Sequence, residues 1–94
     1  MVTVHAQAKG DGWVCEVRLD HGGAHTTHSV SVGRRDVERW ARGSDRNDVE
    51  SLVARSFDFL LEREPPSAIL ATFELSVIQR YFPEYDSTFT NRAT

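Results

Sequence analysis

The chain has 94 residues, 39% of them hydrophobic, and a formal net charge of −3. Such a length predicts one domain with a modest core, and the acidic charge balance gives no overall attraction to nucleic acid or to anionic membranes. The single cysteine, Cys15, excludes an internal disulfide and fits a reducing cytosol. No segment has the pattern of a signal peptide or the ~20 apolar residues of a membrane span. We therefore expect a cytoplasmic domain over residues 1–85 and a flexible polar tail over residues 86–94.

The N-terminal third alternates between apolar and polar residues, which is the pattern of β-strands. Three strands are predicted, over residues 1–8, 13–19 and 26–32, with glycine-containing turns between them. If the apolar faces coincide, Ala6 lies opposite Cys15 and Val4 opposite Val17, while His28 lies opposite Cys15 or Val17. The strands then form an antiparallel meander whose other face is polar enough to remain in water.

Two helices are predicted after the strands, a short one over residues 33–42 and a long one over residues 47–66. In the long helix, apolar residues recur at i, i+3 and i+4 from Val49 to Leu61. Asn47 is the expected N-cap, and two consecutive prolines end the helix. At about 100° per residue its apolar side chains sweep roughly 200°, whereas a helix on one sheet needs an arc of about 100° or somewhat more. The surplus must be covered by the C-terminal third of the chain or by a second copy of the protein.

The C-terminal third predicts two short helical turns, over residues 67–73 and 76–82, with Ser67 and Ser76 as N-caps. Both segments carry enough apolar side chains to cover one flank of the long helix. The whole chain therefore predicts an α+β fold: a three-stranded antiparallel β-meander followed by a short helix, one long helix packed on the sheet, and short C-terminal helical turns.

The second half of the chain is similar to a group of small bacterial proteins known as hypothetical sequences. The similarity is carried by residues 56–65 (SFDFLLEREP), 67–70 (SAIL) and 76–85 (SVIQRYFPEY), and it implies a shared fold without an attached activity. The predicted order of three antiparallel strands and a helix also resembles, in architecture alone, HicB-type antitoxins and other small ligand- or RNA-binding domains. That likeness implies a small nucleic-acid-associated regulator as an alternative function.

Three histidines, His21, His25 and His28, lie within eight residues and could supply metal ligands. His25 and His28 should point to opposite faces of their strand, however, and no cysteine pair accompanies them. Loop and sheet-edge histidines are the stronger interpretation, so we expect no metal and no cofactor. Cys15 could likewise face His28 as a nucleophile and its base, but burial in the central strand favours a structural cysteine. We therefore expect that the protein is not an enzyme.

Arg35, Arg39 and Arg42 recur at i, i+4 and i+7 and form one stripe on the short helix. Such a stripe could bind phosphate, RNA or an acidic protein surface. Acidic neighbours partly neutralise it, and no aromatic side chains for base stacking are interleaved along it. A solvated, partly ion-paired face is the favoured interpretation, and a nucleic-acid site is the alternative.

A partner surface is predicted where the long helix meets the C-terminal aromatic residues. The candidate residues are Phe57, Phe59, Leu61, Tyr81, Phe82 and Tyr85. Aromatic side chains are enriched in the cores of interfaces, although the same residues can close over the helix within one chain. The predicted function is a non-enzymatic interaction or accessory module that self-associates as a homodimer or binds another protein. The alternatives are the nucleic-acid-associated regulator and a metal- or small-ligand-binding domain.

Overall fold

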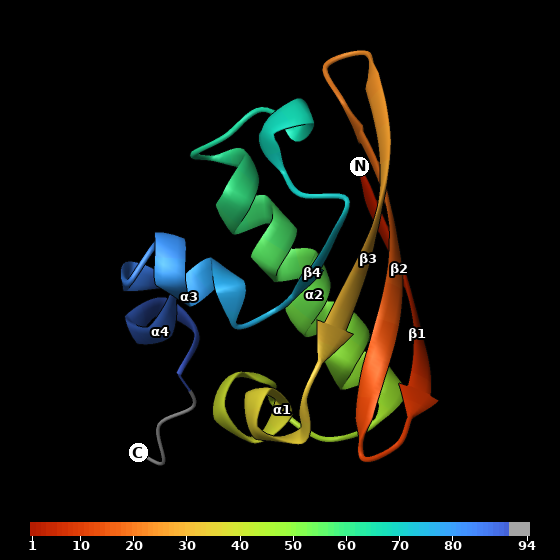
Figure 1. Ribbon diagram of the computed structural model, residues 1–94, viewed down its shortest axis with the longest axis vertical. Coiled ribbons are helices and arrows are strands. Elements are labelled where there is room, and N and C mark those ends of the chain that lie inside the picture. The colour runs from red at the N-terminus through yellow and green to blue at the C-terminus, as the bar shows by residue number, and fades with distance from the viewer. Residues whose placement is uncertain (91–94) are drawn as a thin grey trace.

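The chain folds into two layers, a sheet and a set of helices that all lie on one of its faces (Figure 1). The computed structural model describes residues 1–90. The sheet has four strands that follow one another in sequence order, and the core lies between the sheet and the longest helix. None of the helices described covers the opposite face of the sheet, which stays largely polar as the alternation predicts. The α+β class predicted from the sequence is confirmed.

The three long strands are β1 (Val2–Lys9), β2 (Gly12–His21) and β3 (Ala24–Val32), and they form the predicted antiparallel meander. Ala6 pairs with Cys15 and Val4 with Val17, which confirms the predicted register. His28 lies opposite Val17, the second of its two predicted partners. Both tight turns contain glycines with positive φ, the backbone conformation that favours this residue.

Two helices follow the meander, α1 (Arg34–Trp40) and α2 (Arg46–Leu61). Helix α2 begins earlier than predicted, because Asp45 has the extended backbone of an N-cap and Asn47 lies inside the first turn. It ends at Leu61, before the two prolines as predicted, and the N–H groups of Arg63 and Glu64 donate back to the Leu60 carbonyl. Within residues 1–90, no helix is long and apolar enough to cross a membrane.

The segment after α2 differs from the prediction, because residues 67–73 do not form a helical turn. Only the short 3-10 helix η1 (Pro66–Ala68) is helical, and the chain then becomes strand β4 (Thr72–Glu74), which runs parallel to β3. The Ser29 N–H donates to the Ala71 carbonyl at 2.7 Å beside this pairing. Strand β4 satisfies backbone groups that β3 would otherwise expose at its edge. Phe73, between exposed Thr72 and Glu74, is buried as the strand alternation requires.

Helices α3 (Val77–Tyr81) and α4 (Glu84–Phe89) complete the helical layer. Helix α4 continues past the domain boundary expected at residue 85, and Phe89 is buried in the core. The rest of the expected tail, residues 91–94, lies outside the described residues. Phe59 of α2 meets the rings of Phe82, Tyr85 and Phe89 at centroid distances of 6.1, 5.4 and 5.8 Å. The chain therefore covers most of the surplus apolar arc of α2 by itself.

Glu50 protects the open edge of the sheet at β1. The Ala6 N–H points away from β2 and donates to Glu50 Oε2 of α2 at 2.9 Å, across 44 residues of sequence. A backbone donor on an edge strand is thus paired with a carboxylate of the same chain, which also places charge where another strand would add.

We expect Glu50→Ala to lower the free energy of unfolding by about 1–3 kcal/mol, because the part-buried Ala6 N–H loses its acceptor. Glu50→Gln should lose less, since its amide oxygen can still accept. Urea unfolding followed by tryptophan fluorescence measures both changes. Glu38→Ala, on the exposed surface of α1, is the control, and equal losses for Glu38→Ala and Glu50→Ala would contradict the edge-protecting role.

Candidate functional site

The three candidate histidines do not come together. His21 and His25 are exposed, whereas His28 is buried. The Nδ1–H of His28 donates to the Leu70 carbonyl at 2.7 Å, and its Nε2 lies 2.8 Å from the hydroxyl oxygen of Thr26. In residues 1–90, no group of three or more His, Cys, Asp or Glu side chains is placed to hold a metal ion. His28 instead connects β3 to the segment that leads into β4.

Cys15 is placed as a core residue and not as a nucleophile paired with His28. It is fully buried in β2, and its cross-strand neighbours are Ala6 on β1 and Val30 on β3. Burial, and to a smaller extent the carboxylate of Glu50, raises the pKa of the Cys15 thiol to about 12. Thiol chemistry requires the thiolate, and both ring nitrogens of His28 are already bonded elsewhere.

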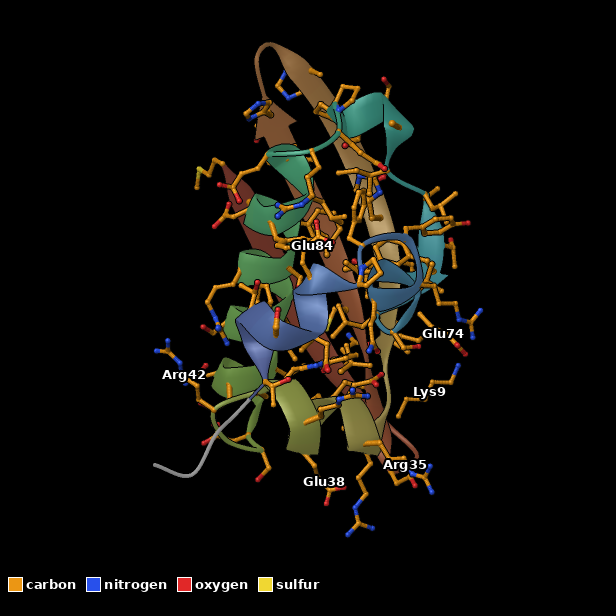
Figure 2. All side chains as sticks on the ribbon, turned by 90° about the vertical axis from the view of Figure 1, so that its left-hand side faces the viewer. Lys9, Arg35, Glu38, Arg42, Glu74 and Glu84 are labelled. Atoms are coloured by element: carbon orange, nitrogen blue, oxygen red, sulfur yellow. The ribbon has the colours of Figure 1, made fainter. Side chains whose placement is uncertain are left out.

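The three arginines of the predicted stripe, Arg35, Arg39 and Arg42, do not form one continuous positive surface. Arg39 Nε donates to Asp86 Oδ1 at 2.8 Å, and its guanidinium lies 5.3 Å from the centre of the Trp40 ring. Arg35 and Arg42 extend in opposite directions in Figure 2. The three guanidinium groups therefore do not face one ligand in this arrangement.

Asp86 connects α4 to α1, although the sequence pattern predicted that it belongs to the flexible tail. Trp40 Nε1–H donates to Asp86 Oδ1 at 2.9 Å, and the Thr90 hydroxyl donates to the same oxygen at 3.0 Å. The bond from Trp40, followed by the bond from Arg39, holds the pKa of the Asp86 carboxyl below its usual range. The spacing of the sequence gave no signal for this contact, because 46 residues separate its partners.

The six predicted partner-binding residues separate into core and surface. Phe57, Phe59 and Tyr85 are buried by their own chain, and the Tyr85 hydroxyl lies 2.7 Å from Ser56 Oγ. Leu61 and Phe82 are half-buried, and Tyr81 is 69% exposed.

An apolar groove of about 220 Å³ opens beside Tyr81, between α2, the η1–β4 segment and α3. The buried side chains of Leu60, Ile69, Phe73 and Ile78 line it, together with Leu70, which is 52% exposed. Leu70 and Tyr81 are, with Met1, the large hydrophobic side chains most exposed to solvent in the described structure. The remaining lining residues are Glu64, Ala68, Val77 and Phe82. Tyr81 and Phe82 were predicted from the sequence as partner-binding residues, but Leu70 and Phe73 were not, because residues 67–73 were expected to form a helical turn.

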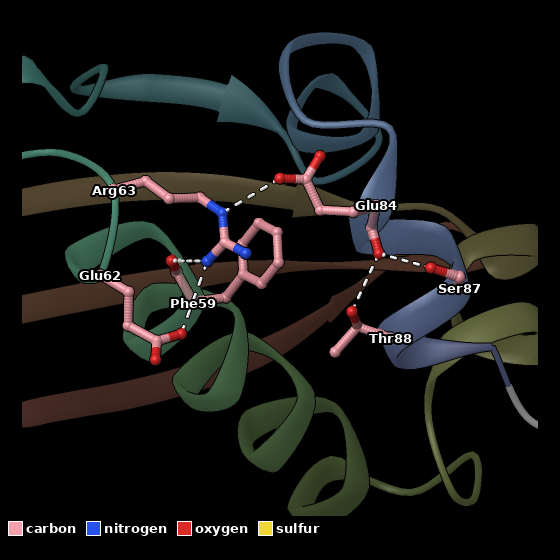
Figure 3. A network of polar contacts seen from close by, with 6 residues as sticks. All are labelled: Phe59, Glu62, Arg63, Glu84, Ser87 and Thr88. Carbon is pink, nitrogen blue, oxygen red and sulfur yellow. Dashed lines mark hydrogen bonds and ion pairs between the residues drawn. The ribbon is translucent and has the colours of Figure 1, made fainter.

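Arg63 fixes α4 and the end of α3 against α2 (Figure 3). Its guanidinium lies 3.6 Å from the centre of the Phe59 ring, and Nη1 donates to the Phe59 carbonyl at 2.9 Å. Nε donates to Glu84 Oε2 at 3.3 Å, at the beginning of α4. In the same network, the hydroxyls of Ser87 and Thr88 donate to the Glu84 carbonyl. The guanidinium also lies 6.0 Å from the centre of the Phe82 ring, so this one lining residue of the groove packs against the same network.

We expect the Cys15 thiol of the native protein to react with a disulfide reagent such as Ellman's reagent far more slowly than a free thiol at pH 8, because it is buried and protonated. The thiol should react fully in urea. Thr27→Cys in a Cys15→Ala chain, which puts a thiol on the exposed sheet face, should react at once. Rapid reaction of native Cys15 would show that the thiol is accessible.

Asp86 should make stability depend on pH in the acid range. Its pKa is lower in the folded chain than the usual ~3.9 of the unfolded chain, so its contribution is complete above that value and is lost as pH falls through the folded pKa. The difference in unfolding free energy between the wild type and Asp86→Asn should therefore shrink as pH falls below about 4. Denaturant unfolding at a series of pH values measures it, and a constant difference would contradict the assigned contacts.

Comparison with known proteins finds no match at three levels. No family model matches the sequence, no curated protein matches it, and no solved structure matches the fold. The functional assignment therefore rests on the contacts of this chain.

Proposed function

We propose that the protein is a non-enzymatic interaction module that binds an apolar side chain of a protein partner in the apolar groove. The observation that carries this proposal is the position of Leu70 and Tyr81, which remain exposed beside a groove lined by core residues. Scattered exposed hydrophobic residues need no explanation, but a contiguous apolar depression with exposed apolar rims is typical of an interaction site. Tyrosine is also enriched among the residues that dominate binding energy.

The groove suits one large side chain and not an extended ligand. Its volume of about 220 Å³ is somewhat larger than a cavity of about 150 Å³ that holds one benzene molecule, so one aromatic side chain fits. Its floor is part of the core, since Phe73 packs against Phe57 at a centroid distance of 6.1 Å. A preformed site loses little side-chain freedom when it is filled, which favours binding.

The contacts of the arginines and histidines give less support to a nucleic-acid-associated regulator or a metal-binding domain. A nucleic-acid-associated regulator needs arginines that can follow a phosphate backbone, and Arg39 is committed to Asp86. A metal-binding domain needs a converging ligand set, and His28 uses both ring nitrogens within the fold.

A variant with a filled groove tests the proposal. Ala68 is exposed and lines the groove. The substitution Ala68→Trp therefore places a large ring where the partner side chain would bind, without removing a core contact. Ala71→Trp is the matched control, because Ala71 is exposed three residues away and does not line the groove. Circular dichroism and thermal unfolding establish that both variants are folded.

Tagged wild-type and variant proteins are used to capture partners from an extract of the source organism, and the captured proteins, including untagged copies of this chain, are quantified by mass spectrometry. We expect at least one specific partner to bind the wild type and Ala71→Trp and to be lost with Ala68→Trp. A captured set that is the same for all three proteins would contradict the groove as the binding site.

A further inference from the structure

The apolar groove and the most exposed apolar side chains beside it lie on the same face of the molecule. Tyr81 and Leu70 form part of the rim, and the groove opens directly next to them. In a two-fold symmetric interface, the same patch of both subunits meets. Tyr81 of each subunit would then face the groove of the other, so one patch supplies both the site and the side chain that fills it.

Two charged residues of opposite sign, Glu64 and Arg80, belong to the segments that form the groove. Glu64 lines the groove, and Arg80 is an exposed residue of α3, the helix that supplies other side chains to the groove. Neither side chain makes a hydrogen bond or an ion pair with another residue of the range 1–90. The neighbouring Arg63, by contrast, is fully engaged with Phe59 and Glu84. From these observations, and resting on the function proposed for the groove, we infer that the partner is a second copy of this chain, with Glu64 of each copy paired to Arg80 of the other.

The sheet edges offer a less suitable route to the same assembly. On β1, the carboxylate of Glu50 occupies the Ala6 N–H. On the other side, β4 already pairs with β3 and is itself only three residues long. Short edge strands and charges at the edge both oppose pairing between sheets. Association through the helical layer, where Leu70 and Tyr81 are exposed, leaves these edges as they are.

The size of the patch sets the expected strength. A stable interface of standard size buries about 800 Å² on each partner, which is about a seventh of the 5902 Å² surface of this chain. The groove and its rim make up only the centre of such an area. We therefore expect a reversible dimer that dissociates on dilution.

Charge reversal tests the pairing. Sedimentation equilibrium of the full chain, over roughly 5 to 500 μM, should show the mass rise from 10.6 kDa toward twice that value. Glu64→Arg and Arg80→Glu should each weaken association about tenfold or more, because like charges then face each other across the two-fold axis. The double variant Glu64→Arg/Arg80→Glu should restore it to within about threefold of the wild type, since the pair is re-formed with exchanged signs. Glu38→Arg, the same charge change on α1 outside the groove, should have no effect.

Tyr81 supplies an independent arm of the test. Tyr81→Ala should weaken association about tenfold or more, and Tyr81→Phe should retain it, because the ring and not the hydroxyl fills the groove. All these residues are exposed or half-buried, and circular dichroism checks that each variant is folded. A wild-type chain that stays monomeric over the whole range, or a double variant that associates no better than the single ones, would overturn the inference.

These outcomes separate the second copy from the groove itself. A monomeric chain whose captured partners are still lost with Ala68→Trp would overturn the second copy and leave the interaction module standing. A dimer that forms equally well with Ala68→Trp would overturn the inferred interface, because the two copies would then meet elsewhere, and the capture experiment would still decide whether the groove binds another protein.

Discussion

Helix α2 carries apolar side chains on two flanks, and the chain is arranged to cover both of them. One flank faces the sheet, where Glu50 accepts from the Ala6 N–H and Phe57 meets the rings of His28 and Phe73. The other is covered by the C-terminal segments, where Phe59 meets three aromatic rings. The cation of Arg63 over the Phe59 ring and the bonds to Asp86 hold these segments in place. The apolar groove lies where this cover ends, between α3 and the η1–β4 segment.

The parts of the fold that follow from local periodicity were predictable. The alternation of Val4, Ala6, Cys15 and Val17 determines both the strands and their register, because a shift of one residue would turn each apolar side chain to solvent. The spacing from Val49 to Leu61 likewise defines α2. Its wide apolar arc indicated that something besides the sheet must cover the helix, and the C-terminal segments of the same chain supply most of that cover.

The parts that depend on contacts between distant residues were not predictable from these patterns. Residues 67–73 are too short for their apolar spacing to distinguish a helical turn from a strand, and the exposed edge of β3 decides in favour of β4. The same holds for the site. Tyr81 and Phe82 were identified because they are aromatic. Leu70 lies beside them only because β4 and the hydrogen bond from His28 to the Leu70 carbonyl fix the position of its segment. The hydrogen bond from Trp40 to Asp86 could not be predicted either, because its partners are far apart in the sequence.

The position of Tyr81 relative to the groove of a neighbouring molecule can be observed directly. In an equimolar mixture of methyl-labelled and unlabelled protein at high concentration, isotope-filtered nuclear Overhauser spectra detect only contacts between molecules. A two-fold interface through the groove predicts cross-peaks from the Tyr81 ring protons of one copy to the methyl groups of Leu70, Val77 and Ile78 of the other. Intermolecular cross-peaks confined to Val2 and Val4 on β1, or none at all, would contradict it.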